Sequence, residues 1–235
     1  MRRHLLSVIA IVAFIGVSAA EASQLVVVES TVAGISSGQI LDGAKPLDIA
    51  AGKSVTVITE SGQVKKLAGP FSGAPAGKAG GGGPDIVASL SRLIEGKSGG
   101  GATLGVMRSG KRSPPPGVWD IDAFRSGTHC IVAGSEARLW RAKAKKKAKL
   151  QIKTLPYGKK VASNWAAGAD VLAWPAAVEI KDGAEYLMRR AKGLTASRVT
   201  LRLIPGDTPS GVHRVAWMAD NGCVRQAKVL LAGLY

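Results

Sequence analysis

The residues whose types and spacing are best suited to chemistry form a cationic run, LWRAKAKKKAKLQIK, from Leu139 to Lys153. Ammonium and guanidinium groups at this density attract polyanions, and salt screens that attraction beyond about 10 Å. The candidate polyanion-binding residues are Arg141, Lys143, Lys145, Lys146, Lys147, Lys149 and Lys153. The flanking apolar residues predict two strands of a hairpin with Lys143–Lys147 at its tip. The alternative interpretation is a solvated tip without a ligand, because edge lysines also discourage sheet aggregation.

Two tryptophans could add stacking contacts to such a site. Trp140 lies beside Arg141, and Trp165 follows in the next apolar run. Exposed indole rings stack on sugars and on cations. Tryptophan also carries much of the apolar burial of a small β domain, so a place in the core is the competing interpretation for both residues.

Patterns typical of catalysis or metal binding are incomplete. Asp120 and Asp122 in WDID would share a face of a strand and could help to chelate a divalent cation, but no third carboxylate lies nearby, so we expect them at the surface. Beyond the N-terminal segment, only His129 and His213 remain, too few for a zinc site. The segments GAPAGKAG and EGKSGG depart from the spacing of a phosphate-binding loop. The sequence therefore predicts no catalytic residue, metal ligand or cofactor.

The N-terminus predicts export from the cytoplasm. Arg2 and Arg3 precede an apolar run, Leu5–Val17, and Ala20-Glu21-Ala22 has the small residues that signal peptidase needs. The run is shorter than the roughly 20 residues of a membrane-spanning helix. We therefore expect residues 1–22 to be a cleaved signal peptide and the protein to be periplasmic or secreted. We therefore expect no nucleic-acid ligand, which leaves cell-wall polymer, lipopolysaccharide and anionic lipid as candidate polyanions.

Composition and cysteine content fit a folded, exported protein. The formal net charge is +16 and the hydrophobic fraction is 46% over 235 residues. The chain has two cysteines, Cys130 and Cys223, and an isolated pair in an oxidising compartment predicts one disulfide. A Cys–His nucleophile is disfavoured, because the neighbouring His129 would point to the opposite face of a strand.

The pattern along the chain predicts a mainly β protein with two small β-rich domains, of sandwich or barrel type. Residues 23–73 carry short alternating apolar runs separated by turn residues. Residues 74–118 are rich in Gly, Pro and Lys and predict a flexible linker, with a short helix near 85–95. Residues 119–235 return to strands and end in a helical hairpin, whose first helix should stop at Asn221-Gly222.

The stretch from Leu25 to Gly73, above all GQILDGAKPLDIAAGKSVTVITESGQVKKLAGP, resembles the FecR-like β modules of bacterial envelope proteins. The remainder, with SGTHCIVAG, LAWPAA and WMADNGCVRQA, is similar to uncharacterised periplasmic proteins of Gram-negative bacteria that join such a module to a disulfide-linked domain. FecR-like modules act in sensing or assembly, so the resemblance implies an envelope protein as partner.

Three functions are compatible with these features. The sequence favours a non-enzymatic binding or scaffolding protein of the cell envelope that acts through protein contacts. The first alternative is a protein that binds acidic polysaccharide or lipid phosphate through the lysine-rich segment. The second is a hydrolase of envelope polymers, which would need a positioned pair of carboxylates in a cleft.

Overall fold

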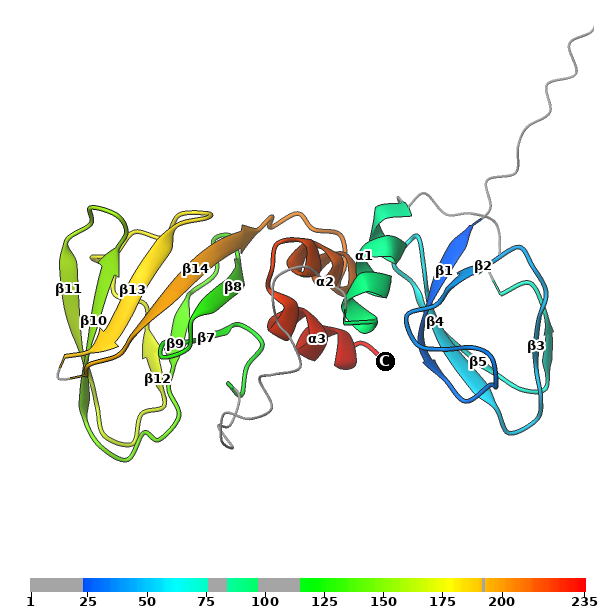
Figure 1. The fold of residues 1–235 in the computed structure, drawn as a ribbon, viewed down its shortest axis with the longest axis horizontal. Coiled ribbons are helices and arrows are strands. Elements are labelled where there is room, and N and C mark those ends of the chain that lie inside the picture. Colours follow the sequence, from blue (N-terminus) through cyan, green and yellow to red (C-terminus); the bar gives the residue numbers. More distant parts are fainter. Residues whose placement is uncertain (1–22, 76–83, 97–114, 192) are drawn as a thin grey trace, which may run out of the picture.

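A computed structural model of the protein describes residues 23–75, 84–96, 115–191 and 193–235. These residues form two β-rich parts with three helices between them, shown in Figure 1. The fold is mainly β with a C-terminal pair of helices, as the sequence predicts. The predicted signal peptide and most of the predicted linker lie outside the described residues. Within those ranges, no helix combines the length and apolar character needed to cross a membrane.

The N-terminal β part, residues 24–73, is a pair of small sheets facing each other. Its strands are β1 (Gln24–Ser30), β2 (Ile40–Asp42), β3 (Leu47–Ile49), β4 (Ser54–Thr59), β5 (Val64–Ala68) and β6 (Phe71–Gly73). The larger sheet has the order β2-β1-β4-β5, and β3 pairs with β6. Strand β1 reads as an unbroken apolar run because both of its faces are covered: Leu25 and Val27 face the small sheet, while Val26 and Val28 face the helices.

The C-terminal β part, residues 120–204, is a sandwich. Its strands are β7 (Asp120–Asp122), β8 (Gly127–Val132), β9 (Arg138–Trp140), β10 (Ala148–Thr154), β11 (Lys160–Trp165), β12 (Val171–Ala173), β13 (Glu185–Arg190) and β14 (Ala196–Ile204). One sheet has the order β11-β10-β13-β14-β8 and the other β12-β9-β7. Leu139 from the smaller sheet and Leu150 and Ile152 from the larger one lie in the same core.

Three helices form a layer that packs on both β parts. They are α1 (Pro84–Ile94), α2 (Gly211–Asp220) and α3 (Val224–Ala232). Their apolar residues share one core with Val26 of β1 and Ile204 of β14. Helix α1, from within the predicted linker, is therefore part of a core that both β parts share.

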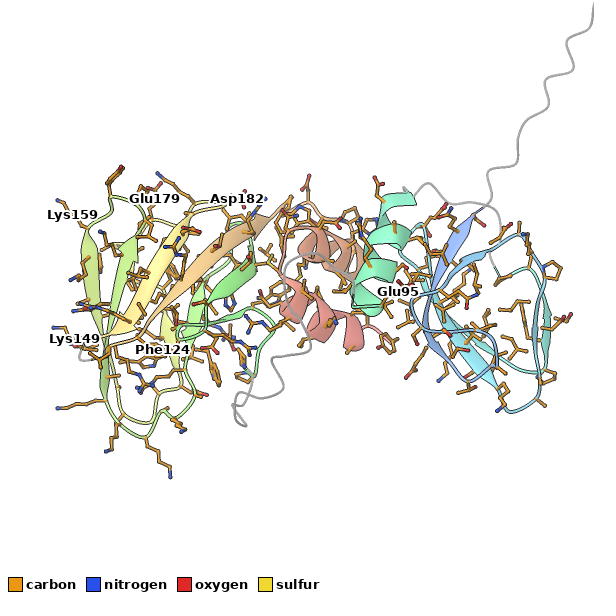
Figure 2. All side chains as sticks on the ribbon, viewed as in Figure 1. Glu95, Phe124, Lys149, Lys159, Glu179 and Asp182 are labelled. Carbon is orange, nitrogen blue, oxygen red and sulfur yellow. A yellow bond between two sulfur atoms is a disulfide. The ribbon has the colours of Figure 1, made fainter. Side chains whose placement is uncertain are left out.

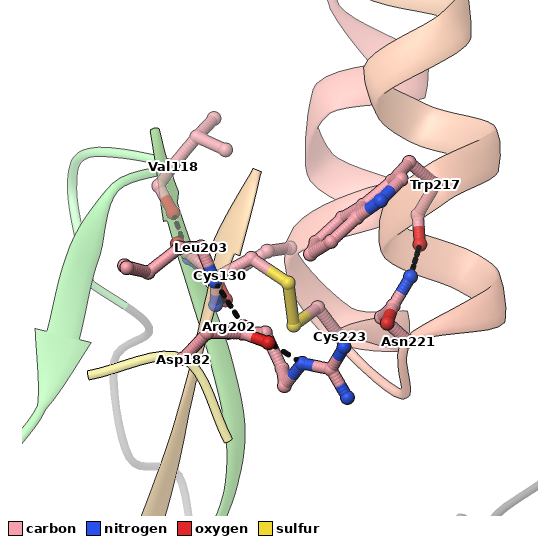
Figure 3. The surroundings of a disulfide bond; sticks show 9 residues. Val118, Cys130, Asp182, Arg202, Leu203, Trp217, Asn221 and Cys223 are labelled. Carbon is pink, nitrogen blue, oxygen red and sulfur yellow. Dashed lines mark hydrogen bonds and ion pairs between the residues drawn. A yellow bond between two sulfur atoms is a disulfide. The ribbon is translucent and has the colours of Figure 1, made fainter. Parts of the chain in front are cut away.

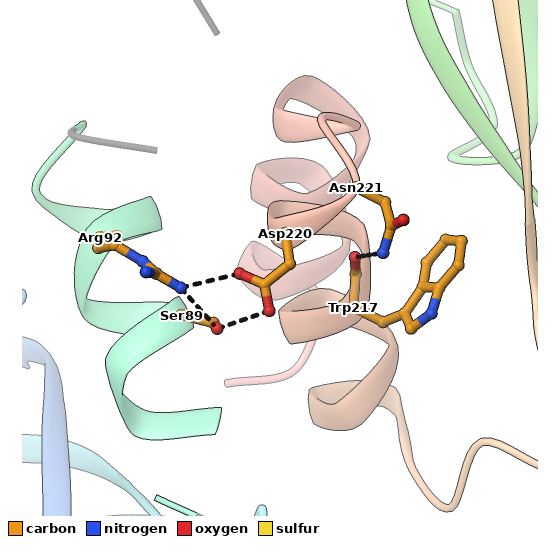
Figure 4. Close-up of polar contacts among 5 residues, drawn as sticks. All are labelled: Ser89, Arg92, Trp217, Asp220 and Asn221. Carbon is orange, nitrogen blue, oxygen red and sulfur yellow. Dashed lines mark hydrogen bonds and ion pairs between the residues drawn. The ribbon is translucent and has the colours of Figure 1, made fainter. Parts of the chain in front are cut away.

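Polar contacts fix α1 against α2, as Figure 4 shows. The Ser89 hydroxyl donates to one carboxylate oxygen of Asp220 at 2.7 Å, and Arg92 donates to the other at 3.0 Å. On the opposite side, the Ser91 hydroxyl donates to the Gly38 carbonyl at 2.6 Å. Helix α1 is thus bound by side chains both to the C-terminal helices and to the N-terminal β part.

The C-terminal helices are attached to the second β part by the disulfide between Cys130 and Cys223, drawn in Figure 3. The Cα atoms of the two cysteines are 5.9 Å apart, and the bond joins β8 to the residue that precedes α3. The predicted disulfide is confirmed. Helix α2 ends at Asp220, and Gly222 has a φ of 81°, which the predicted glycine-terminated end requires. Its N-cap is Ser210, whose hydroxyl accepts from the His213 amide.

Candidate functional site

The cationic segment, residues 141–147, connects β9 to β10. These two strands do not pair: β9 pairs with β7 and β12, whereas β10 pairs with β11 and β13. The predicted hairpin is therefore wrong. The segment crosses from one sheet of the sandwich to the other, because Leu139 and Leu150 enter the same core from opposite layers. Its lysines belong to a crossover loop.

Arg141 is buried and organises this loop. Only 2% of the residue is exposed, and its guanidinium lies over the Trp165 ring, 4.9 Å from the centroid. Its Nε donates to the carbonyl of Ala169 (3.0 Å), Nη1 to Lys146 (2.9 Å), and Nη2 to Ala144 (3.2 Å) and Ala166 (2.6 Å). Burial lowers the pKa of Arg141, the nearby Arg190 lowers it further, and Asp170 raises it. The prediction that Arg141 itself contacts a polyanion is corrected: its donors serve two backbone carbonyls of this loop and two of residues 166–169.

The loop forms one wall of a cleft of about 1310 Å³. The lining residues are Arg141, Lys143, Lys145, Lys146, Lys147, Ala148, Lys149, Asn164, Trp165, Ala166, Arg190 and Ala191. Seven of them carry a positive charge, and none is an aspartate or glutamate. The cleft therefore has a single sign of charge, which is the requirement for attracting a polyanion.

The backbone of the loop is fixed while its lysine side chains extend into solvent. Lys143 has a φ of 62°, in the left-handed region, and the Ala144 carbonyl accepts a second hydrogen bond from the Gly168 amide at 2.8 Å. Lys143, Lys145, Lys146 and Lys147 are all exposed. A ligand would thus meet cations whose backbone is already ordered, which reduces the entropy cost of binding.

Three other residues of the predicted site do not have the predicted role. Trp140 and Trp165 are 4% and 1% exposed, so neither offers a free ring face to a sugar, and the stacking prediction is wrong for both. The Trp165 ring lies in the hydrophobic core between the two sheets. Lys153 lies along β10 opposite Lys160 of β11 and does not line the cleft. Lys149, which lines the cleft, and Lys159, which does not, lie at opposite ends of this sheet, as Figure 2 shows.

A second, smaller cavity of about 90 Å³ lies where β7 and β8 meet the start of α3. Asp120 and Asp122 line it and are 2% and 3% exposed, so the expected surface placement is wrong. Asp120 is held by Arg138, whose Nη2 is 2.8 Å from its Oδ1, and by the Gly117 amide at 3.0 Å. Among the residues that the structure describes, no group of His, Cys, Asp or Glu side chains is arranged to hold a metal ion.

His129 also lines this cavity, on the face of β8 opposite to Cys130. It is 5% exposed, and neither ring nitrogen has a hydrogen bond of normal geometry. Burial lowers the pKa of His129 to about 4, and Arg225 lowers it too. A hydrogen-bonding contact with the Arg125 backbone raises this pKa, while the Arg125 charge lowers it. His129 is therefore neutral at neutral pH.

The low pKa of His129 predicts a loss of stability in mild acid. The unfolded chain has the ordinary histidine pKa of 6.5 and takes up a proton before the folded protein does, so the free energy of unfolding should fall as pH falls from 6.5 to 4. The shift corresponds to about 3 kcal/mol. Urea denaturation of the wild type and of His129→Gln across this range checks the prediction. The difference between the two curves should change with pH, and parallel curves would contradict it.

Comparisons with known proteins gave no match. Neither a protein-family model, nor a curated protein, nor a solved structure is similar to the chain. The resemblance of Leu25–Gly73 to FecR-like modules consequently stays a prediction.

Sequence reasoning did not find several residues of these two cavities. Arg190 and Asn164 reach the cleft from β13 and β11, and Arg125 and Arg225 lie on the smaller cavity. Each is a single polar residue inside or beside an apolar run, with no spacing that sets it apart. Only the pairing of strands and the disulfide bring these residues together.

Proposed function

We propose that the protein binds an extended polyanion of the cell envelope through the cationic cleft. The observation that carries this proposal is the lining itself: seven cationic side chains, no carboxylate, and a loop backbone held by buried Arg141. Isolated surface lysines are commonly solvated and without a partner. Here the fold concentrates them on one cleft, where their potentials add.

The ligand class follows from the size and charge of the cleft. Its volume of about 1310 Å³ is above the 300–1,000 Å³ common for sites of small molecules, so a polymer segment fits it better than a single small anion. Carboxylate or phosphate groups repeated along a chain could each meet a different lysine. The export signal predicted from the sequence points to acidic polysaccharide or lipopolysaccharide and away from nucleic acid.

The hydrolase alternative gains no support from this cleft. Glycoside hydrolysis needs two carboxyl groups on either side of the scissile bond. The lining contains none. Binding without turnover is the function that these residues support.

The test compares two variants of equal net charge. Changing Lys143, Lys145, Lys146 and Lys147 to serine should weaken binding of oligogalacturonate or lipopolysaccharide about tenfold to thirtyfold, at roughly 0.3–0.5 kcal/mol per lost charge contact. The matched control changes Lys53, Lys66, Lys159 and Lys160, which are also exposed but lie away from the cleft. Affinity is measured by isothermal titration calorimetry at low and high salt.

The control variant should retain the affinity of the wild type apart from a small long-range effect. Equal losses in both variants would mean that net charge alone drives binding and would overturn the cleft as the site. Absence of binding by the wild type at low salt would overturn the proposed function itself.

Protein scaffolding, favoured by the sequence, is a second proposal with its own support. In the four-stranded sheet of the N-terminal β part, β2 and β5 are the edge strands, and β2 carries the exposed Ile40. An edge strand can receive an added strand from a partner. A pull-down from envelope extract at high salt tests it: a defined protein retained by the wild type and by the lysine variant alike is the expected result.

A further inference from the structure

The lining of the small cavity beside the disulfide has two carboxylates and two guanidinium groups, and Arg138, outside the lining, adds a third guanidinium group that binds Asp120. Asp120 is already paired with Arg138 and with the Gly117 amide, and Asp122 accepts from the Phe124 amide at 3.1 Å. The two guanidinium groups of the lining are those of Arg125 and Arg225.

These two guanidinium groups repel each other. Burial lowers the pKa of Arg225, the charge of Arg125 lowers it further, and Asp122 raises it. Both cations also act on the buried ring of His129. Two like charges held together at one cavity destabilise the unliganded protein, and an anion between them would remove that cost.

His129 supplies an unused hydrogen-bonding group at the same place. Its ring is buried, lines the cavity, and has no hydrogen bond of normal geometry at either nitrogen. Buried polar groups are nearly always paired, so a ring left in this state calls for a partner. A neutral imidazole carries one N–H, which can donate to an oxyanion.

Gln226 and the disulfide fix the backbone that carries His129 and Arg225. Gln226 joins α3 to β8: its Oε1 accepts from the Cys130 amide at 2.8 Å, and its Nε2 donates to the Cys130 carbonyl at 2.9 Å. Of the two disulfide cysteines, Cys130 directly follows His129, and Cys223 lies two residues before Arg225. Gly127 gives Arg225 its room, since a Cβ there would stand 3.1 Å from Nη2.

We propose that this cavity binds a phosphate group between Arg125, Arg225 and His129. The volume of about 90 Å³ is that of roughly three water molecules, which suits a phosphate and excludes a sugar ring. Guanidinium groups match phosphate oxygens through paired N–H donors. The phosphate is either free or the end of a larger molecule that extends out of the cavity. This site is separate from the lysine cleft.

The experiment titrates the purified protein with inorganic phosphate and, in a second arm, with glycerol 3-phosphate, at constant ionic strength. Calorimetry should give one phosphate per chain, and the ring signals of His129 should shift in NMR while those of His213 do not. Binding of both probes identifies a terminal phosphate group as the ligand. Binding of inorganic phosphate alone identifies the free ion.

Two variants and one control make the proposal falsifiable. Arg225→Gln and Arg125→Gln should each weaken phosphate binding at least tenfold, while the melting temperature without phosphate stays unchanged or rises because one of two repelling charges is gone. The four-lysine variant of the cleft should bind phosphate like the wild type. The proposal is overturned if neither probe binds, if both arginine variants still bind, or if binding disappears with the lysines.

Discussion

Replacing Cys130 and Cys223 together with alanine should lower the free energy of unfolding by about 4–5 kcal/mol, which is the value that the loop-entropy model gives for a bridge across 93 residues. The unfolded chain gains the freedom that the bridge removes. Alanine is the suitable replacement because both residues are fully buried, and serine would leave hydroxyl groups without partners. Urea denaturation of variant and wild type measures the difference.

The location of the bridge predicts where the variant will loosen first. The bond ties β8 to the start of α3, so hydrogen exchange should rise in α3 and in Gly127–Val132 more than in β1 and β4. Wild-type protein unfolded in a strong reductant serves as the control and should show the same loss of stability. A loss below about 1 kcal/mol would mean that the helical layer is held by packing alone.

The disulfide and the secondary structure were largely predictable, because both rest on local information. Two cysteines allow only one intramolecular pairing, whatever the fold. Alternation in RVTLRLI marks β14, and Asn221-Gly222 marks the end of α2, because each depends on neighbours within a few residues.

The path of the cationic segment was not predictable, because strand pairing is decided by the core. Two apolar runs joined by a few polar residues read as a hairpin, and nothing in EARLWRA or AKLQIKTL says that they belong to different sheets. The structure separates them because Leu139 and Leu150 must fill one core from two sides. The segment predicted as a hairpin tip is therefore a crossover loop between the two sheets, and its lysines line a cleft.

The burial of these polar residues was not predictable from the sequence, because it too depends on tertiary contacts. Asp120 and Asp122 read as surface residues, since isolated polar residues usually are. They are buried because Arg138 of β9 and the neighbouring amides of Gly117 and Phe124 satisfy the two carboxylates. The opposing Arg225 lies 96 residues after His129, and the disulfide, Gln226 and apolar packing bring α3 to this strand.

Arg141→Met should weaken polyanion binding although every lysine of the cleft remains. Arg141 donates to four backbone carbonyls, and methionine fills a similar volume without any donor. Carbonyls left unpaired in a buried site cost about 1–3 kcal/mol each where water cannot reach them. Since part of this loop can reach water, we expect the free energy of unfolding to fall by about 3 kcal/mol in total.

The binding result separates two accounts of the cleft. If the lysines act only through long-range electrostatic attraction, the conformation of the loop has no effect on binding. Arg141→Met then removes one charge, and the affinity should fall less than twofold, at about 0.3 kcal/mol for one exposed contact. If the fixed backbone contributes to affinity, the ligand must order the loop in Arg141→Met, because Arg141 no longer does so. The affinity should then fall about tenfold, which corresponds to about 1.4 kcal/mol.

Arg141→Lys is the matched control, because lysine keeps the charge but lacks the planar fork that reaches several carbonyls at once. It should behave like Arg141→Met in binding and only partly recover the stability. Titration calorimetry with oligogalacturonate, at a temperature where both variants are folded, gives the affinities. Full affinity in Arg141→Lys would show that charge at this position is sufficient, and the ordered loop would then have no part in binding.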